Sequence, residues 1–166
     1  MDNQKNVLEI KRYPDPILRR KSAKVHEIDL NVVKLLEDML RTMYAFGGIG
    51  LAASQVGSLV QIIVADTGEG AIKLINPCII NGKEENKLAE GCLSLPDINV
   101  EIKRPYEIIV EGLNEKNELI EIKASGLLAR VIQHEMDHLR GRLIIDYLGL
   151  IDKMKLFKLK KRKQRE

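Results

Sequence analysis

The chain has 166 residues, of which 45% are hydrophobic, and this size suits one globular domain with a core of its own. Its two cysteines are too few for a disulfide framework, and no apolar run approaches the roughly 18 residues of a membrane-spanning helix. The first residues, Met1–Lys5, are polar, unlike a signal or transit peptide. We therefore expect a cytoplasmic protein without membrane partners.

The first predicted helix covers residues 30–46. Asp29 is a suitable N-cap, and Gly47 with Gly48 ends the helical pattern. The apolar residues at helical spacing are predicted to face the core, methionines included; they are Val32, Leu35, Leu36, Met39, Leu40 and Met43.

The middle of the chain predicts strands. They are expected at residues 59–65, 71–75, 98–102, 107–113 and 119–124. A second helix begins at Ser125 or Gly126 and ends at Gly141. Strands followed by a late helix, without regular alternation, favour an α+β fold with mainly antiparallel sheet.

The end of the chain differs in charge from the rest. Residues 153–166 hold eight Lys or Arg and one acid, a local charge of +7, so the net +3 leaves −4 for residues 1–152. Leu150, Met154 and Phe157 recur at helical spacing, which predicts an amphipathic helix docked on the body. We expect one domain over residues 1–152 and a basic helical tail over 153–166. Such a tail suits a phosphate backbone, and a merely solvated terminus is the alternative.

An HExxH pattern lies in the second predicted helix. His134 and His138 are four residues apart, so both imidazoles face the same side and can bind one metal ion. Glu135 is placed to handle the protons of a water on that metal. Two surface histidines beside a solvated glutamate are the alternative, but a shuffled sequence would seldom give this pattern.

The third metal ligand must come from elsewhere in the chain. An extended HExxHxxGxxH pattern would need a histidine where Ile144 stands, so the candidates are His26, Cys78 and Cys92. Cys92 is favoured, because Gly91 allows an unusual backbone and Pro96 ends a strand ladder, which would present the thiol at a loop or strand end.

The two other candidates have simpler explanations. Cys78 precedes two isoleucines in a predicted strand, where a buried thiol acts as a small hydrophobic residue. His26 lies among charged residues and is expected in solvent.

A glycine-rich segment at residues 48–57 is a third motif. Its glycines permit close approach of another chain, and Gln55 is a lone amide in an apolar run, suited to a carbonyl or oxyanion. Taken alone, the segment is better explained as a glycine-rich loop that closes a helix, with Gln55 bonded to a neighbouring backbone group.

Together the motifs GIGLAASQVG, EGCLSLP and QHEMDHLRG, at 48–57, 90–96 and 133–141, resemble the three signature motifs of peptide deformylase. The segment YPDPILR at 13–19 is similar to that family's opening, so the resemblance covers most of residues 7–150. It implies sheets wrapped around a central helix that carries HExxH. It also implies a metal-dependent hydrolase that removes the N-formyl group from the N-terminal methionine of new polypeptides and releases formate.

The resemblance assigns the metal and its chemistry. Cys92, His134 and His138 would hold one divalent ion, with Fe2+ expected in the cell and Zn2+, Ni2+ or Co2+ as alternatives. Glu135 would be the general acid/base, while the Gln55 amide and the backbone N–H of Leu93 would hold the oxyanion.

The resemblance also suggests the substrate's position. The peptide would run as an extra strand beside Gly48, Ile49 and Gly50. The methionine would enter a pocket formed partly by Ile49 and the helical turn before His134. Arg130 precedes His134 by one turn, so its stem is expected to face that pocket while its guanidinium reaches solvent.

Further expectations concern support and partners. Glu90 and Arg104 are expected to brace the Cys92 segment as an ion pair, with an exposed pair of little effect as the alternative. The family's C-terminal helix is associated with the ribosome, so the tail is expected to contact rRNA, and the protein to be a monomer. Competing functions are another metallo-amidase and a non-catalytic metal- or RNA-binding protein.

Overall fold

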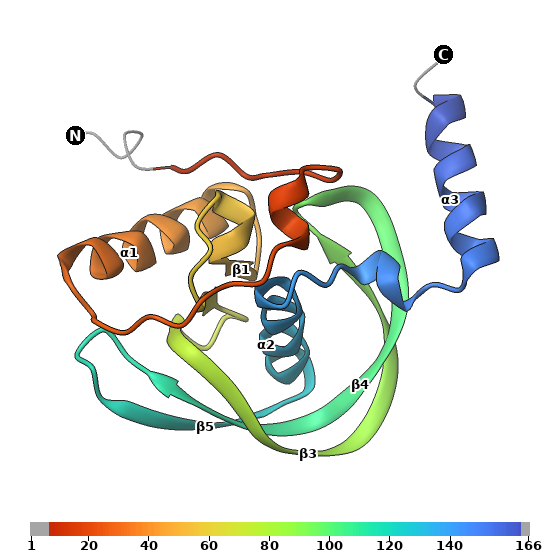
Figure 1. Ribbon diagram of the computed structural model, residues 1–166. Helices are drawn as coiled ribbons and strands as arrows, with labels where there is room; N and C mark the ends of the chain where they lie inside the picture. Colours follow the sequence, from red (N-terminus) through yellow and green to blue (C-terminus); the bar gives the residue numbers. More distant parts are fainter. Residues whose placement is uncertain (1–6, 164–166) are drawn as a thin grey trace.

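The computed structural model describes residues 7–163, with side chains up to residue 158. Within this range the chain forms helices, strands and short 3₁₀ helices (Figure 1). The helices are α1 (Leu30–Ala45), α2 (Gly126–Leu139) and α3 (Leu150–Lys163), and the 3₁₀ helices are η1 (Pro16–Arg19), η2 (Ala53–Val56) and η3 (Ile144–Tyr147). The strands are β1 (Gly50–Ala52), β2 (Ile62–Ala65), β3 (Ile72–Cys92), β4 (Leu95–Leu113) and β5 (Leu119–Ser125). The predicted α+β class is confirmed.

The strands form one antiparallel sheet in the order β1-β2-β3-β4-β5, rather than several sheets. β1 and β5 are therefore the edges. β1 pairs only with β2, with Gly50 opposite Ala65, so its other side has no strand partner within the described residues.

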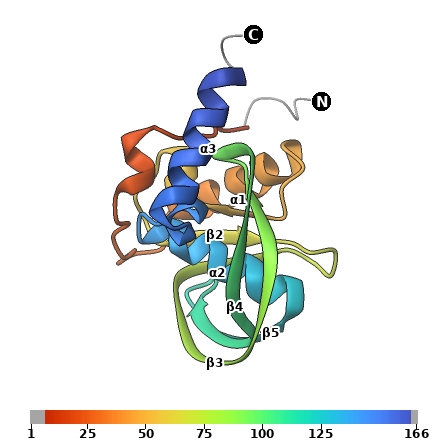
Figure 2. The same cartoon turned by 90° about the vertical axis from the view of Figure 1, so that its right-hand side faces the viewer.

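The hairpin of β3 and β4 is much longer than the sequence predicts. Residues 98–102 and 107–113 belong to the same strand, and Pro105 lies within it opposite Glu85. Most of residues 76–92, which are rich in charge, also pair with β4, because β4 supplies the hydrogen bonds that local propensity does not favour. Register shifts occur at three points along the hairpin, and the sheet curves around α2 (Figure 2).

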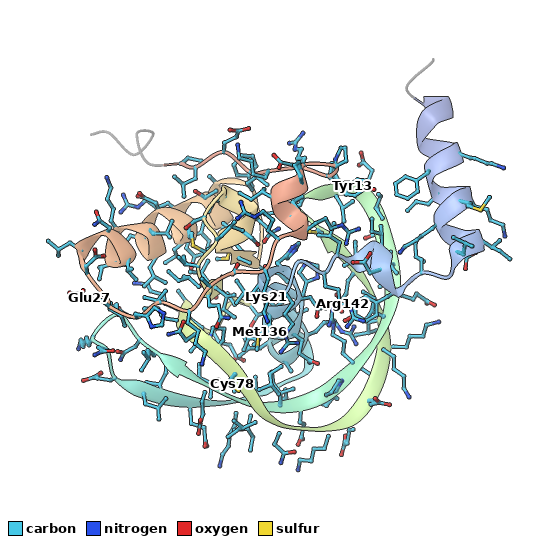
Figure 3. All side chains as sticks on the ribbon, viewed as in Figure 1. Tyr13, Lys21, Glu27, Cys78, Met136 and Arg142 are labelled. Carbon is cyan, nitrogen blue, oxygen red and sulfur yellow. The ribbon has the colours of Figure 1, made fainter. Side chains whose placement is uncertain are left out.

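α2 is the central element. Every residue from Ala129 to Leu139 is buried, and Met136 lies at the middle of the molecule in Figure 3. One face of α2 packs against β2, β4 and β5 through an apolar cluster that includes Ile63, Val110 and Ile132. A helix buried on all sides keeps its polar residues only where they find partners, so the polar side chains of α2 indicate a site.

α1 agrees with its prediction. The Asp29 carboxylate accepts hydrogen bonds from the N–H groups of Asn31 and Val32, which caps the helix. Leu36, Met39 and Met43 are fully buried against β1 and β2. The methionines are thus core residues, as predicted.

α3 projects from the body, and only part of it docks (Figure 1). The ring of Phe157 stacks on Tyr13 with 5.8 Å between ring centroids, and Leu156 packs beside it. Leu150 and Met154 are exposed, so the prediction that they share a docking face with Phe157 is wrong. The predicted boundary between residues 152 and 153 falls inside α3, and residues 164–166 of the predicted tail lie outside the described residues. No helix among residues 7–163 has both the length and the apolar content that crossing a membrane requires.

Candidate metal centre and substrate cavity

Three side chains converge where α2 meets the end of β3. Sγ of Cys92 lies 3.2 Å from Nε2 of His138, which is also 3.2 Å from Nε2 of His134. The ligand atoms of all three residues lie within 4.8 Å of one another. These separations suit donor atoms that each lie roughly 2.0–2.3 Å from one metal ion.

The two alternative ligands are elsewhere. His26 is exposed before α1, as predicted. Cys78 is also exposed, on the outer side of β3 (Figure 3), so its predicted burial is wrong. Of the three candidates, the structure places only Cys92 beside the two α2 histidines.

The end of the β3–β4 hairpin positions Cys92. Cys92 pairs with Leu95 across the two-residue turn Leu93–Ser94, next to a register shift after Glu90. The thiol therefore stands at a strand end, but Pro96 does not end the ladder, because β4 begins before it. A proline near the start of a strand is tolerated where its missing N–H is not needed.

The protonation of the two histidines fits a site built for a cation. Burial lowers the pKa of His134, but hydrogen bonds with Cys92 and Glu90 outweigh it and hold the pKa well above its usual range. Burial and the neighbouring His134 push the pKa of His138 well below its usual range. The pKa values of the two imidazoles are therefore shifted in opposite directions. A thiol and two imidazoles are donors that suit a transition metal. A metal ion would bind these donors in place of the protons that they carry without it.

Glu90 is the hub of the hydrogen bonds behind this site. Its carboxylate accepts from Nε and Nη2 of Arg104 at 2.6 and 2.9 Å, and from Nη1 of Arg130 at 2.7 Å. Its Oε2 lies 3.0 Å from Nδ1 of His134. Burial raises the pKa of Glu90, but the hydrogen bonds from His134 and Arg104 outweigh it and bring the pKa to about 2. The Glu90–Arg104 pair is therefore buried and multiply bonded, unlike an exposed surface pair.

The network extends to two residues that the sequence did not indicate. Arg104 Nη1 donates to Oδ2 of Asp137 at 2.9 Å, and the Tyr147 hydroxyl donates to the same oxygen at 2.7 Å. Asp137 is the second x of HExxH, a position with no motif requirement. The sequence could have indicated Asp137 through its spacing of three residues from His134, since residues i and i+3 share a helix face.

Glu135 is buried and lines the same cavity as Cys92 and His134. It is 4% exposed, and among the described residues its Oε2 has no hydrogen-bond partner. Burial raises the pKa of Glu135 from 4.5 to about 7. Such a carboxyl exchanges protons near neutral pH, as general acid/base chemistry requires.

Gln55 is fixed at both ends of its amide. Oε1 accepts from the backbone N–H of Ala52 at 2.9 Å, and Nε2 donates to Oγ of Ser94 at 3.1 Å. Nε2 also lies 3.6 Å from Sγ of Cys92. Gln55 therefore presents an oriented donor at the edge of the site, and Ser94, which the sequence did not single out, holds it there.

A cavity of about 480 Å³ opens beside the site. It is lined by predicted site residues and by others that the sequence did not indicate, among them Ala89, Leu127 and Val131. Leu127, Val131 and Glu135 are spaced four residues apart on α2, so they form one row beside the metal-facing row. This four-residue spacing is the sequence feature from which the cavity wall could have been predicted.

Arg130 lines this cavity, but not in the predicted way. Its guanidinium is buried and donates to Glu90, to the carbonyl of Ile102 at 2.9 Å, and to Oδ1 and the carbonyl of Asn86 at 2.6 and 3.0 Å. The prediction that it reaches solvent is wrong, because these acceptors on β3 and β4 satisfy it inside the protein. Arg130 therefore joins α2 to both strands of the hairpin.

The sequence and the fold have close relatives of known class. A family model for polypeptide deformylase matches residues 7–154. A peptide deformylase of Thermodesulfovibrio yellowstonii is 46% identical over 159 residues, covering 93% of this chain and 96% of the relative. The crystal structure of peptide deformylase from Thermotoga maritima has a TM-score of 0.83 at 43% identity, covering 86% of this chain and 98% of that one. The structure from Ehrlichia chaffeensis, in complex with actinonin, has a TM-score of 0.90 at 38% identity, covering 97% and 99%. The chain therefore belongs to the polypeptide deformylase family of enzymes, which remove the N-formyl group from the N-terminal methionine of polypeptides.

Proposed function

We propose that this deformylase acts through one divalent metal ion held by Cys92, His134 and His138, with Glu135 as the general acid/base. The observation that supports this most directly is that the buried Glu135, with a pKa of about 7, lines the same cavity as the candidate ligands Cys92 and His134. A metal at these donors supplies positive charge that acidifies a water and polarises the formyl carbonyl.

The proton path then uses Glu135 alone. Its carboxylate accepts the proton that water loses as the water oxygen bonds to the formyl carbon. The same carboxyl then gives that proton to the nitrogen as the C–N bond breaks, which leaves formate and a free amine. A carboxyl that is neutral and charged in comparable amounts near pH 7 suits both steps.

The developing negative charge on the carbonyl oxygen needs preorganised donors. Gln55 Nε2 supplies one, because the Ala52 and Ser94 contacts hold the amide in a single orientation. The backbone N–H of Leu93, in the tight turn after Cys92, supplies the second. Both donors are fixed before substrate binds, so little reorganisation accompanies the reaction.

The substrate is the formyl-methionyl end of a nascent polypeptide. Its backbone lies along Gly48, Ile49 and Gly50, since β1 is a sheet edge and an added strand would satisfy free backbone groups. The methionine side chain fills the cavity between Ile49 and the Leu127–Val131 row of α2. Met side chains suit an irregular apolar cavity of this size.

Metal identity, location and assembly complete the proposal. Fe2+, which the family resemblance implies, is the physiological ion. Zn2+, Ni2+ or Co2+ can substitute for it, because a thiolate and two imidazoles accept all of them. With iron and a thiolate ligand, activity should decline within hours in air. The enzyme is a cytoplasmic monomer, and the basic tail at 153–166 contacts rRNA near the emerging chain.

Formate release from a short formyl-Met peptide tests this proposal. The assay is run anaerobically with Fe2+-loaded wild type and with Glu135→Ala carrying the same metal content. We expect turnover by the wild type and a loss of at least about a hundredfold in the variant. Equal rates, or cleavage of internal peptide bonds in unformylated peptides instead, would contradict the proposal and favour another metallo-amidase.

A further inference from the structure

The catalytic cavity has an open end beside the C-terminus of α1. On its β1 side the cavity is lined by Gly47, Gly48, Ile49 and Gly50. A Cβ at Gly50 would lie 2.5 Å from Oε1 of Glu135, so the proton-transferring carboxyl is at the Gly50 end of this row. At the other end, a Cβ on Gly47 would meet no atom within 4 Å. A peptide whose formyl group is near Glu135 therefore leaves the cavity past Gly47.

A second cavity, of about 450 Å³, lies beside that end. Phe46, which precedes Gly47 in the chain, forms one side of it. The segment before η1 forms the rest, through Glu9, Ile10, Lys11, Arg12 and Asp15. Phe46 is 44% exposed, and Tyr44 and Ile49 on either side of it are exposed as well. Phenylalanine is usually buried, and clustered exposed apolar side chains indicate a binding surface.

The wall of the second cavity is attached to the catalytic elements. The N–H of Lys11 donates to the carbonyl of Gln55 at 2.7 Å, and the N–H of Tyr13 donates to the carbonyl of Ser94 at 2.9 Å. In Figure 1 this segment, in red, runs along the end of α1 toward the turn between β3 and β4. The second cavity is therefore formed before a peptide binds, which lowers the entropic cost of binding.

The spacing along an extended chain sets which peptide residue reaches Phe46. The carbonyl of Ile49 accepts a hydrogen bond from the residue after β2, so the carbonyls of Gly48 and Gly50 face the open edge of the sheet. A peptide that enters at Gly50 and leaves past Gly48 runs antiparallel to β1 and advances one residue for each residue of β1. With its methionine opposite Gly50, its third residue lies opposite Gly48, and its fourth and fifth residues reach Phe46.

We propose that the second cavity binds the fourth and fifth residues of the formyl-Met polypeptide, and that the Phe46 ring selects a large apolar or aromatic side chain there. This inference rests on the proposed function, from which it takes the position of the methionine. Aromatic pairs add attraction beyond the area that they bury.

Charge should not decide which side chain the second cavity accepts. Two cations, Lys11 and Arg12, and two anions, Glu9 and Asp15, line it, so the lining has no net charge. Both anions also have partners, because Glu9 pairs with Lys11 and Asp15 accepts from the N–H of Ile17. The ring of Phe46 is thus the feature that distinguishes one peptide from another.

Formate release from peptides of different length and sequence tests the second cavity. The full-length, metal-loaded protein is assayed with formyl-Met-Ala-Ser and with pentapeptides that extend it by two residues. These residues are both Ala, or one of them is Phe, Glu or Lys. We expect Phe at the fourth or fifth position to raise kcat/KM about fivefold over Ala, since contacts remote from the reacting bond contribute to transition-state binding. Glu and Lys should stay within about twofold of Ala.

Variants of Phe46 assign this preference to its ring. Phe46→Ala should bring the ratio of kcat/KM for the Phe and Ala pentapeptides close to one, whereas Phe46→Tyr, which keeps a ring, should preserve the ratio. Leu119→Ala is the control, because Leu119 is exposed on β5 and lines neither cavity. Each ratio is measured within one protein, so differences in metal content or folded fraction cancel.

The outcomes separate this inference from the proposed function. Formate release from the tripeptide, with no effect of Phe at the fourth or fifth position, would overturn the second cavity as a peptide site and leave the proposed function intact. A preference for Phe that survives Phe46→Ala, or a preference for Glu or Lys over Phe, would also overturn it. No formate from any of the peptides would overturn the proposed function, and the inference with it.

Discussion

The Nδ1 atom of His134 lies 3.0 Å from Oε2 of Glu90, on the side of the imidazole that faces away from Cys92 and His138. A carboxylate at Nδ1 fixes the tautomer that leaves Nε2 free for a metal and makes that nitrogen more basic. We therefore expect Glu90→Gln to weaken metal affinity by about 10- to 100-fold. Competition with a chelator measures it, and Glu101→Gln, in a surface pair with Lys87 on the same hairpin, is the control.

Glu90 also governs the acid stability of the metal-free protein. Its pKa in the fold is about 2, below the ordinary 4.5, because His134 and Arg104 outweigh the effect of burial. A lowered folded-state pKa stabilises the fold above pH 4.5, and this stabilisation is lost as the pH falls from about 4.5 through about 2. Urea unfolding between pH 2.5 and 6 should show up to roughly 3 kcal/mol of pH-dependent stability in the wild type. The same component should be missing in Glu90→Gln, and parallel curves for the two proteins would refute this.

The contribution of Glu135 to the stability of the metal-free protein should change with pH in the opposite direction. Its pKa is raised from 4.5 to about 7 by burial, so its contribution to stability is fully present below pH 4.5 and is lost as the pH rises through about 7. Replacing it with the neutral isostere Gln removes the need to bury a charge. Metal-free Glu135→Gln should therefore be more stable than the wild type at pH 8, by on the order of 1–3 kcal/mol, and nearly equal at pH 4.5.

The activity of the same variant completes that prediction. Glu135→Gln cannot accept a proton, so formate release should fall by at least about a hundredfold while metal content is unchanged. Lower stability of Glu135→Gln at pH 8 would show that burying the charged carboxylate does not destabilise the wild type. Retained activity would show that the carboxyl is not used in catalysis.

The local features of the chain could be predicted from the sequence, while features that depend on distant partners could not. The HExxH spacing and the Asp29 cap act within one or two helical turns, and both are present in the structure. The pairing of residues 76–92 with β4 involves charged residues of weak strand propensity, so only the partner strand reveals it.

The same distinction applies to the site. The convergence of Cys92 with the two histidines was predicted because each lies in a recognisable motif. The burial of Arg130 was not, because its acceptors, Asn86 and Ile102, come from two strands more than 25 residues away. Long polar side chains are normally in solvent, so sequence alone gives no reason to bury one.

Arg130 should influence substrate binding more than the chemical step. Its guanidinium ties Asn86 of β3 to α2, and Arg130 forms part of the cavity wall, but its hydrogen bonds go to Glu90, Ile102 and Asn86 rather than to a candidate metal ligand. We expect Arg130→Met to raise KM for formyl-Met peptides by about tenfold, with kcat within about threefold of the wild type. Steady-state kinetics at equal metal content measure both parameters. A fall in kcat with unchanged KM would instead assign Arg130 to the reaction itself.

Gly50 provides the space in which the Glu135 carboxyl lies. A Cβ at Gly50 would come within 2.5 Å of Oε1 of Glu135 and 2.6 Å of Cγ1 of Val131, both closer than van der Waals contact allows. Gly50→Ala must therefore displace the carboxyl or the β1 backbone, and a displacement of about 1 Å near a reacting group can cost about a hundredfold in rate. We expect kcat to fall by that order while the metal bound at Cys92 is retained. Gly149→Ala is the control, since a Cβ there meets no atom within 4 Å, and it should leave kcat unchanged. Normal turnover by Gly50→Ala would mean that Glu135 can work from another position.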